Sequence, residues 1–520
     1  MQKSFNIEGL CIPEQHYMVD ISSKLDGICS LIEQGKYFTI NQARQYGKTT
    51  TMELLRRSLE KQYVVLSLSF EEFGKETFAN ENQFVRDFLE IQLFPELELQ
   101  KEDLNIFMEQ NRKILTDKNE KFNLAKLSRI FTELCKTLDK PIVMMIDEVD
   151  SACNNQVFID FLAVLRAGYM KRSRMKAFQS VILAGVYDVK NVKVKLEPDH
   201  EKHNSPWNIA ADFDVDLGFS VEDIQTMLQD YMVEQHKKMD VISLAKLIFA
   251  YTSGYPYLVS YVCKKMDKEQ LEWNGENIQK VIYEMPKETN PLFDDIIKKL
   301  EQHEGFRKMV ERILLVGEEI TFVRSNPDID LGVVFGIFKN REQKVCISNE
   351  IFEMFIYEYM ISMRRNRDDR LSNYSDTSLY VQNGKLDMDL VVRRFADFIK
   401  AEYREEDQAF IEQQGRLLFL CFIRPIINGT GHYAVEAQTR KNKRMDVQIF
   451  YGNEEFIVEL KCWRGMKYEK EGYDQLAGYL DARGKEKGYM ISFCRNKERP
   501  AEDRVFMYKA KEIVETIVMY

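Results

Sequence analysis

The sequence lacks the features that would place it in a membrane or outside the cell. No uncharged apolar stretch among its 520 residues is long enough to span a bilayer, and its first thirty residues contain no signal-peptide pattern. Its nine cysteines form no C-x-x-C pair and no Cys/His group, which excludes a disulfide framework and a structural zinc site. We therefore expect a cytoplasmic protein with reduced, mostly buried thiols.

Residues that break regular structure are also scarce. There are 24 glycines and 11 prolines, whereas 45% of the residues are hydrophobic and 30% are charged. This composition is typical of a folded, helix-rich protein and not of a disordered one. A chain of 520 residues exceeds the size at which one core keeps growing, so we expect two to four domains.

Positive charge is not in excess. The formal net charge of −10 excludes a protein that coats nucleic acid uniformly, although local runs can still form basic patches. Two such runs are TRKNKR at 439–444 and MRRNR at 363–367. Either run alone is more typical of a solvated face than of a binding surface.

Apolar runs of strand length alternate with helical patterns in the first part of the chain. The runs are YFTI (37–40), YVVLSLSF (63–70), PIVMMIDEVDSA (141–152) and SVILAGVYDV (180–189). Parallel strands that are covered on both faces read as continuous apolar runs. The pattern therefore predicts an α/β fold with a mostly parallel sheet and helices on both faces.

A phosphate-binding loop is predicted after the first run. The stretch FTINQARQYGKTTTMELL (38–55) contains a strand, a loop and a helix in the order that such a loop requires. Its backbone N–H groups and helix N-terminus would surround the phosphates of ATP. Gln42 stands where the first glycine normally stands, which alters the entry to the loop without removing a ligand. The candidate ATP-binding residues are Arg44, Gly47, Lys48, Thr49, Thr50 and Asp147.

An acidic pair lies within the third run. Asp147 and Glu148 are delivered to the carboxyl end of a strand, where open α/β sheets place their ligands. Asp147 and Thr49 would hold the Mg²⁺ of ATP, and Glu148 would act catalytically by orienting the attacking water. The alternative is an acidic helix start favoured by the helix dipole.

The rest of the chain divides by its patterns. A helical stretch begins with Ser220 as an N-cap, a later stretch combines helices with a hairpin as a winged helix does, and a polar segment then reads as a linker. The predicted domains are a P-loop AAA-like ATPase core (1–218), a helical lid (219–300), a winged-helix-like region (301–365), a linker (366–384) and a C-terminal domain (385–520).

Four segments together resemble the AAA-like ATPase domain of bacterial ATPases that carry a restriction-endonuclease-like C-terminal domain. They are FNIEGLCIPEQHYMVDIS (5–22), YFTINQARQYGKTTT (37–51), IDEVD (146–150) and YTSGYPYLVS (251–260). That family usually lacks the entry glycine and has Arg at the position of Gln42. The resemblance implies that His16, Tyr17 and Asp20 lie near the base of the nucleotide. Arg166 is a candidate arginine finger.

The C-terminal domain carries a second acidic pattern in KRMDVQIFYGNEEFIVELKCWRG (443–465). A hairpin there would bring Asp446 alongside Glu459, and Lys461 would share the sheet face of Glu459 because it lies two strand residues further on. Two adjacent carboxylates bind Mg²⁺, or Mn²⁺ in its place, and Lys461 would stabilise charge on a phosphate. The alternative is an ordinary cross-strand pair of charges.

This second pattern is similar to the PD-(D/E)XK nuclease superfamily. The resemblance implies a restriction-endonuclease-like α/β domain in which Gln475 is a further catalytic residue and Glu412 a further metal ligand, with Glu436 as its rival. The candidate nuclease residues are Asp446, Glu459, Lys461, Gln475 and Glu412.

The combined hypothesis is an ATP-hydrolysing module that gates a Mg²⁺-dependent nuclease acting on DNA, with homo-oligomers as a further expectation. Two alternatives stay open. The first is a nucleotide-switched signalling or scaffold protein whose nuclease fold binds nucleic acid without cutting it. The second is a nuclease directed at RNA.

Overall fold

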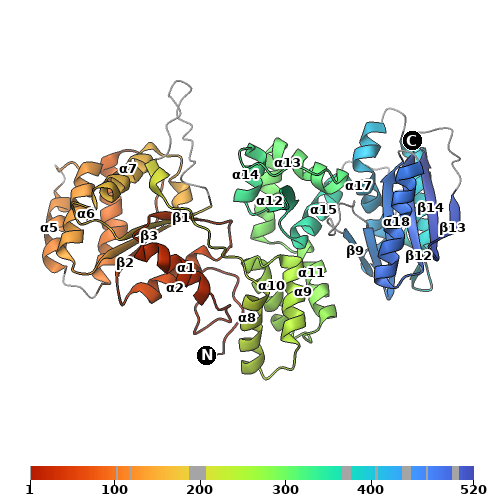
Figure 1. The fold of residues 1–520 in the computed structure, drawn as a ribbon, viewed down its shortest axis with the longest axis horizontal. Coiled ribbons are helices and arrows are strands. Elements are labelled where there is room, and N and C mark those ends of the chain that lie inside the picture. The colour runs from red at the N-terminus through yellow and green to blue at the C-terminus, as the bar shows by residue number, and fades with distance from the viewer. Residues whose placement is uncertain are drawn as a thin grey trace. The chain divides into compact units, whose positions relative to one another are not determined.

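The computed structural model describes most of the chain (Figure 1). The described residues are 2–100, 104–117, 120–186, 206–365, 376–403, 408–435, 447–463, 466–494 and 503–519. The chain divides into two compact units, the first from Met1–Ile278 with Val333–Gly336 and the second from Gln279–Gly332 with Ile337–Tyr520. No helix within the described ranges is long and apolar enough to cross a membrane.

A four-stranded parallel sheet forms the centre of the first unit. Its strands are β1 (Phe38–Asn41), β2 (Val64–Ser69), β3 (Ile142–Asp147) and β4 (Ser180–Gly185), in the order β1-β4-β3-β2. Phe38 pairs with Ile182 and Ser69 pairs with Asp147, and all three strand pairs are parallel. The prediction of an α/β fold with a parallel sheet is confirmed, and the carboxyl ends of its strands lie at one edge.

Helices cover both faces of this sheet (Figure 1). On one face, Ile28, Ile32 and Leu55 pack into the core from α1 (Ser22–Glu33) and α2 (Lys48–Leu59). The other face packs against an aromatic core. Residues of this core come from the following helical elements: α3 (Glu81–Asp87), η1 (Phe88–Leu93), α4 (Phe94–Glu98), α5 (Asn105–Thr116), α6 (Leu124–Thr137), η2 (Val149–Ser151) and α7 (Gln156–Lys171).

The aromatic core gives this layer much of its stability. Phe161 is fully buried, and its ring lies 5.4 Å from the rings of both Phe84 and Phe88. Truncating a buried phenylalanine to alanine costs about 3–5 kcal/mol, because it removes apolar burial and leaves a cavity. The edge of the sheet that holds the loop is thus fixed by packing on both of its faces.

A group of helices follows the sheet along the chain. They are η4 (Pro206–Ile209), α8 (Val221–Glu234), α9 (Val241–Thr252), α10 (Pro256–Lys268) and α11 (Gly275–Glu284). The last of them, α11, begins in the first unit and ends in the second. Ser220 caps α8: its side chain accepts from the Asp223 N–H, and the Asp223 carboxylate accepts from the Ser220 N–H. The predicted N-cap at Ser220 is confirmed, and the return bond from the Ser220 N–H to Asp223 completes a capping box.

The helices and the hairpin that come next in the chain lie mainly in the second unit. They are η5 (Met285–Lys287), α12 (Pro291–Gln302), α13 (Glu304–Glu311), η6 (Arg312–Val316), α14 (Pro327–Val334), β5 (Phe338–Arg341), β6 (Lys344–Ile347) and α15 (Glu350–Arg365). The turn between β5 and β6 has left-handed φ angles at Glu342 (+51°) and Gln343 (+62°). Two such residues match the twist of the flanking strands, so the predicted hairpin closes tightly.

A six-stranded mixed sheet forms the C-terminal part. Its order is β13-β14-β12-β11-β10-β9, and β10 with β11 is the antiparallel hairpin expected from the sequence. The strands are β9 (Gly431–Val435), β10 (Val447–Tyr451), β11 (Glu454–Cys462), β12 (Lys487–Cys494), β13 (Arg504–Tyr508) and β14 (Lys511–Met519). The β11–β12 and β12–β14 pairs are parallel, which leaves three parallel strands in its centre.

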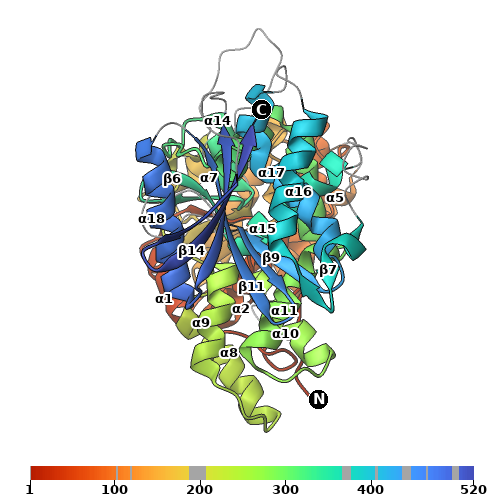
Figure 2. The ribbon, with the colours of Figure 1, turned by 90° about the vertical axis from the view of Figure 1, so that its right-hand side faces the viewer.

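Helices lie on both faces of this sheet as well. Figure 2 shows α18 (Met466–Arg483) on one face, with α16 (Met388–Glu402) and α17 (Gln408–Ile427) on the other. The remaining small elements are η8 (Thr377–Leu379), β7 (Val381–Gln382) and β8 (Lys385–Leu386). Because side chains alternate along β11, its two faces meet different helices, and α18 covers the face that carries Glu459 and Lys461.

Candidate functional site

The predicted phosphate loop connects β1 to α2. Two of its residues have left-handed backbones, Gln45 with φ +55° and Gly47 with φ +79°. Gln42 has no positive φ, and its N–H donates to the Gly185 carbonyl at 3.2 Å, which extends the pairing of β1 with β4. The entry position therefore needs no glycine in this chain, since the unusual backbone lies further along the loop.

The Lys48 side chain bonds back to the first residues of the loop. It is 8% exposed, and its Nζ donates to the carbonyls of Gln42 at 2.9 Å and Ala43 at 3.0 Å. An ammonium group has three N–H donors, so these two bonds leave a third for a phosphate oxygen. Burial lowers the pKa of Lys48, while the negative charges of Asp150, Glu148 and Asp147 act in the opposite direction.

Thr49 and Asp147 meet across the sheet edge. The Thr49 hydroxyl donates to Asp147 Oδ2 at 2.8 Å, although the two residues are 98 positions apart. The other carboxylate oxygen of Asp147 accepts from the Glu148 N–H at 2.9 Å. A hydroxyl and a carboxylate oxygen at this distance are the donor types that Mg²⁺ prefers, so the pair fits the ion that accompanies ATP.

Glu148 follows with a strained backbone. Its φ is +55°, a left-handed conformation that costs free energy for a residue with a side chain. Burial raises the pKa of its carboxyl, and the negative charge of Asp147 raises it further. A raised pKa makes this carboxylate a better proton acceptor than an ordinary one.

Asp150 was not predicted to have a role. Both of its carboxylate oxygens accept from the Val186 N–H at 2.8 Å, which holds the end of β4 beside the end of β3. Gly185 permits this approach, since a Cβ there would lie 2.7 Å from Asp150 Oδ1. The only signal in the sequence is the position of Asp150 in IDEVD, three residues after Asp147.

An N-terminal segment, residues 2–17, contacts both α2 and α8. The Cys11 N–H donates to the Thr50 hydroxyl at 3.2 Å, so this candidate ATP ligand is bonded to the segment. At its other end Lys3 forms an ion pair with Asp230 of α8 at 2.8 Å. The segment therefore joins the loop's helix to the helices that follow the sheet.

The residues that the family resemblance placed near the base belong to this region. The Tyr17 hydroxyl accepts from Gln235 Nε2 at 2.8 Å, and its ring packs 5.2 Å from that of Tyr231. The His16 imidazole accepts from the Ile12 N–H at 2.8 Å. Asp20 bonds to Ser22 at the start of α1, and the candidate arginine finger Arg166 lies exposed on α7.

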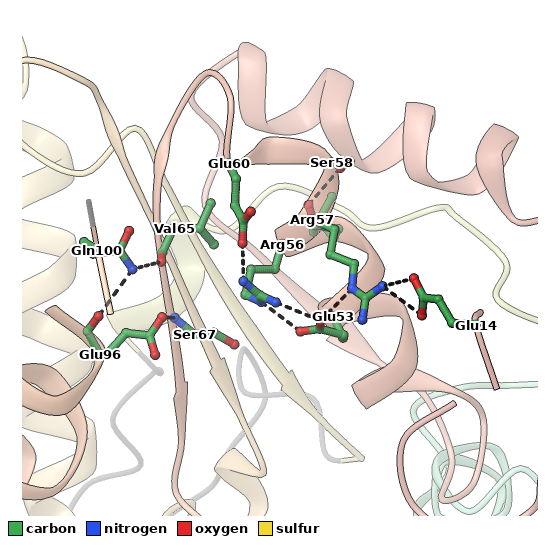
Figure 3. A network of polar contacts seen from close by, with 11 residues as sticks. Glu14, Glu53, Arg56, Arg57, Ser58, Glu60, Val65, Ser67, Glu96 and Gln100 are labelled. Atoms are coloured by element: carbon green, nitrogen blue, oxygen red, sulfur yellow. Dashed lines mark hydrogen bonds and ion pairs between the residues drawn. The ribbon is translucent and has the colours of Figure 1, made fainter. Parts of the chain in front are cut away.

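A polar network on the outer side of α2 holds the loop's helix in place (Figure 3). Glu53 bonds to Arg56 and Arg57 at 2.8 Å, and Arg57 reaches Glu14 of the N-terminal segment at 3.0 Å. Hydrogen bonds from Arg56, aided by Arg57, lower the pKa of Glu53 to about 2. Arg56 also contacts Glu60, so its charge is shared by two carboxylates.

Two tyrosines pack beside the loop, a contact that sequence reasoning missed. Tyr46 and Tyr255 meet edge to face with ring centroids 4.8 Å apart, and burial raises the pKa of Tyr46 to about 12. The Tyr255 hydroxyl donates to the Arg44 carbonyl at 2.5 Å, while the Arg44 side chain is exposed. No local pattern could reveal this, because Tyr255 lies 211 residues after Arg44.

In the C-terminal sheet, Glu459 and Lys461 lie on one face of β11. Glu459 is fully buried, and the Lys461 Nζ lies 3.6 Å from its carboxylate. Lys461 also donates to the Gln475 side-chain oxygen on α18. Gly472 leaves room for the lysine stem, since a Cβ there would be 3.1 Å from Lys461 Cδ. The structure thus brings together three of the predicted nuclease residues.

The other predicted nuclease residues are not described in full. Asp446, Glu436 and the run 439–444 lie outside the described residues, and for Glu412 only the backbone, within α17, is described. Within the described ranges no three His, Cys, Asp or Glu side chains group as a metal site. Of the carboxylates predicted for the nuclease, Glu459 is the one whose side chain lies within the described residues.

His432 is held by stacking and not by polar groups. Its ring lies 4.1 Å from that of Tyr283 and 4.7 Å from that of Phe450. Burial lowers its pKa to about 4, so the imidazole is neutral at physiological pH. These contacts agree with a packing role on β9.

A second buried acid, Glu515, shares the α18 side of the sheet and was not predicted. It is fully buried and accepts from Ser492 at 2.5 Å, Tyr473 at 2.8 Å and Arg504 at 2.5 Å. Register links it to the candidate site, because Glu459 pairs with Met490 and Met490 pairs with Glu515. Its signal in the sequence is a lone acid between apolar neighbours in IVETIV.

Comparison with known proteins extends over the first two thirds of the chain. A family model described as an AAA-like domain matches residues 14–358. No curated protein matches the sequence. The model match ends at residue 358, before the C-terminal sheet begins.

Solved structures also resemble the chain. The Walker-type ATPase of Pyrococcus abyssi is 12% identical over 68% of this chain and 99% of its own, with a TM-score of 0.46. The Thermotoga maritima RuvB Holliday junction branch migration motor is 11% identical over 63% and 90%, with a TM-score of 0.32. The Aeropyrum pernix ORC1 protein in complex with DNA is 12% identical over 67% and 94%, with a TM-score of 0.29. At these scores the likenesses carry no functional argument.

Proposed function

Because the chain belongs to the AAA-like domain family, we propose that its first unit binds ATP with Mg²⁺ and hydrolyses it. The observation that carries this proposal is the 2.8 Å hydrogen bond between Thr49 and Asp147. It joins the end of the phosphate loop to the acidic strand, which are the two parts that P-loop hydrolysis requires.

Each residue has a role in this proposal. Lys48 neutralises charge on the phosphates with its third donor, while Gly47 and the start of α2 offer backbone N–H groups. Thr49 and Asp147 would hold the Mg²⁺, which supplies charge neutralisation when bound. Glu148 accepts a proton from the water that attacks the γ-phosphorus, the bond to the bridging oxygen breaks, and ADP and phosphate leave.

Substitution of Lys48 tests the proposal directly. Lys48→Ala should abolish ATP binding, measured by calorimetry, while the circular dichroism spectrum and thermal midpoint stay close to those of the unaltered protein. Lys61→Ala, beyond the end of α2, is the matched control for loss of one lysine charge. ATP binding that survives Lys48→Ala would overturn the assignment of the loop.

We propose further that the C-terminal domain is a Mg²⁺-dependent nuclease acting on DNA, and that the nucleotide state of the first unit gates it. Burial of Glu459 beside Lys461 supports this, since a buried charge is costly unless a partner or metal offsets it. Lys461, with Gln475, would stabilise the phosphate as its bond breaks. Asp446 is proposed as the second carboxylate, with Glu412 as an additional ligand.

The same proposal covers the remaining expectations from the sequence. Residues 301–365 are proposed as a winged-helix-like region that contacts DNA or transmits the nucleotide state, and 366–384 as a linker. Copies of the chain are proposed to associate, which would allow Arg166 to act on the nucleotide of a neighbour. These roles rest on sequence patterns and on the exposure of Arg166.

The alternative is a nucleotide-switched scaffold whose nuclease fold does not cut. In that case Glu459, Lys461 and Gln475 would bind nucleic acid without breaking its phosphodiester bonds. Incubating the protein with plasmid and single-stranded DNA in Mg²⁺ or Mn²⁺, with and without ATP, separates the two. Cutting that Lys461→Ala abolishes supports the nuclease, whereas ATP turnover without cutting supports the scaffold.

A further inference from the structure

The loop lacks its usual entry glycine, yet two of its residues keep left-handed backbones. Gln45, at φ +55°, has a side chain that makes this conformation costly. Such a conformation persists only where neighbouring groups hold it. The side chains that contact the loop therefore help to determine the direction in which its backbone N–H groups point.

Three successive carbonyls of the loop are held by side chains. Lys48 Nζ bonds to the carbonyls of Gln42 and Ala43, and the Tyr255 hydroxyl bonds to the carbonyl of Arg44 at 2.5 Å. Tyr255 is 3% exposed and precedes the first residue of α10, so its ring has little freedom to move. It is thus a fixed donor placed on the loop from a distant part of the chain.

The hydrogen bond from Tyr255 also sets the direction of the Gln45 N–H, because that N–H belongs to the same peptide bond as the Arg44 carbonyl. The chain has no cis peptide bond within its described residues, so the C=O of Arg44 and the N–H of Gln45 point in opposite directions. A hydroxyl that fixes the Arg44 carbonyl toward Tyr255 therefore fixes the Gln45 N–H away from it. That N–H belongs to the run of loop donors that ends at Gly47.

Close packing leaves Tyr255 and the loop little space to shift. Gly336, which belongs to the same unit, has φ +70°, and a Cβ there would lie 2.7 Å from the Ala43 Cβ and 3.5 Å from the Tyr255 ring. The missing side chain at position 336 therefore allows the three groups to meet. A larger residue would push on Ala43, whose carbonyl holds Lys48.

We propose that Tyr255 is a positioning residue that orients the Gln45 N–H toward the nucleotide phosphates by fixing the Arg44 carbonyl. This role rests on the ATP binding proposed above. Tyr255 does not itself touch the nucleotide. Its hydroxyl acts through the Arg44 carbonyl, and Gly336 provides the space for it.

The test is Tyr255→Phe in the full chain, which removes one oxygen and keeps the ring. The loss of one neutral hydrogen bond should weaken Mg²⁺-ATP and Mg²⁺-ADP binding about threefold to tenfold in calorimetry. Because the loop contacts the phosphates before and during reaction, the KM for ATP should rise while kcat changes little. Tyr261→Phe, on the same helix, is the matched control and should leave both constants unchanged.

Gly336→Ala provides an independent variant, which should also weaken binding by displacing Ala43. If Lys48→Ala loses ATP while Tyr255→Phe binds it normally, the positioning role is overturned and ATP binding stands. A fall in kcat and thermal midpoint with no change in KM would assign Tyr255 to packing and also overturn the role. No ATP binding by the unaltered protein would overturn both proposals.

Discussion

The two candidate sites differ in how their side chains are satisfied. In the phosphate loop, Lys48 and Thr49 already bond to partners that hold them in place for a ligand. In the C-terminal sheet, Glu459 is fully buried and lies 3.6 Å from Lys461, a longer contact than the bonds of the loop. The loop side chains are thus already held by short hydrogen bonds, whereas Glu459 is a fully buried acid beside a lysine.

This contrast has an energetic meaning. A loop that is already held by hydrogen bonds needs little rearrangement when phosphates bind. The free energy of binding is therefore not reduced by the cost of ordering the loop. A buried carboxylate gains from any cation that reaches it, since burial penalises its charge. The two proposed sites would therefore differ in what favours their ligands: hydrogen bonds that already order the loop at the first, and the buried Glu459 carboxylate at the second.

Substitution of Glu148 should have the largest effect, and the effect should be confined to the first candidate site. Glu148→Gln is expected to lower the kcat of ATP hydrolysis by about 10²- to 10⁴-fold, because it removes the proposed proton acceptor, while ATP still binds. In the unaltered protein, burial raises the pKa of Glu148, so activity should fall at a higher pH than for an ordinary carboxyl as the solution is acidified. Steady-state rates across pH measure both effects, and an unchanged kcat would contradict the role.

Arg504→Ala should have the next largest effect and should act on the second unit. It leaves the buried Glu515 carboxylate with Ser492 and Tyr473 as donors, and should destabilise that unit by about 1–3 kcal/mol. Denaturant unfolding followed by limited proteolysis separates the two units. Lys509→Ala, on an exposed ion pair at 2.6 Å, is the control and should change little.

Glu353→Gln should change the pH dependence of stability in the second unit. Glu353 is 6% exposed on α15, and burial raises its pKa well above the ordinary value, with the charge of Glu350 adding to the shift. A raised folded pKa gives stability that is full below the unfolded pKa and is lost as pH rises through the folded pKa. Thermal midpoints from pH 4 upward should therefore decline in the unaltered protein and decline less in the variant. Equal slopes would contradict the shift.

Glu14→Ala should have the smallest effect. It removes the exposed ion pair with Arg57 at 3.0 Å, and surface pairs of this kind contribute about 0–1 kcal/mol. A midpoint change near zero with unaltered ATP affinity is expected. A large loss of ATP affinity would show that the N-terminal segment governs the loop through Arg57.

The sequence predicts those features that depend on neighbouring residues. The four strands, the loop, the N-cap at Ser220 and both hairpins follow from apolar runs and from cap and turn residues that lie close together in the chain. The contacts of Tyr255, Asp150 and Glu515 were not predicted, because their partners are brought close by the fold. Local patterns contain no information on a contact such as that between Tyr255 and Arg44.

The same limit applies to the candidate site. Thr49 and Asp147 were paired in advance because the order of a phosphate loop and an acidic strand is a known combination of two local motifs. Gly472 and Gly336 gave no comparable signal, since their importance lies in the atoms that would meet a side chain. For Asp446 the pairing with Glu459 stays a prediction.

The N-terminal segment has a consequence for the synthesis of the protein. Lys3 pairs with Asp230, 227 residues later, and Phe5 packs on Tyr231 and Trp273. At about 5–20 residues per second, a ribosome needs roughly 10 to 50 seconds to produce those partners. During that interval the residues of α8 that the segment contacts have not been synthesised. The segment can therefore join α2 to α8 only after all four strands of the sheet have been synthesised. A nascent chain would therefore acquire its ATP-binding loop early and the contacts that steady it late.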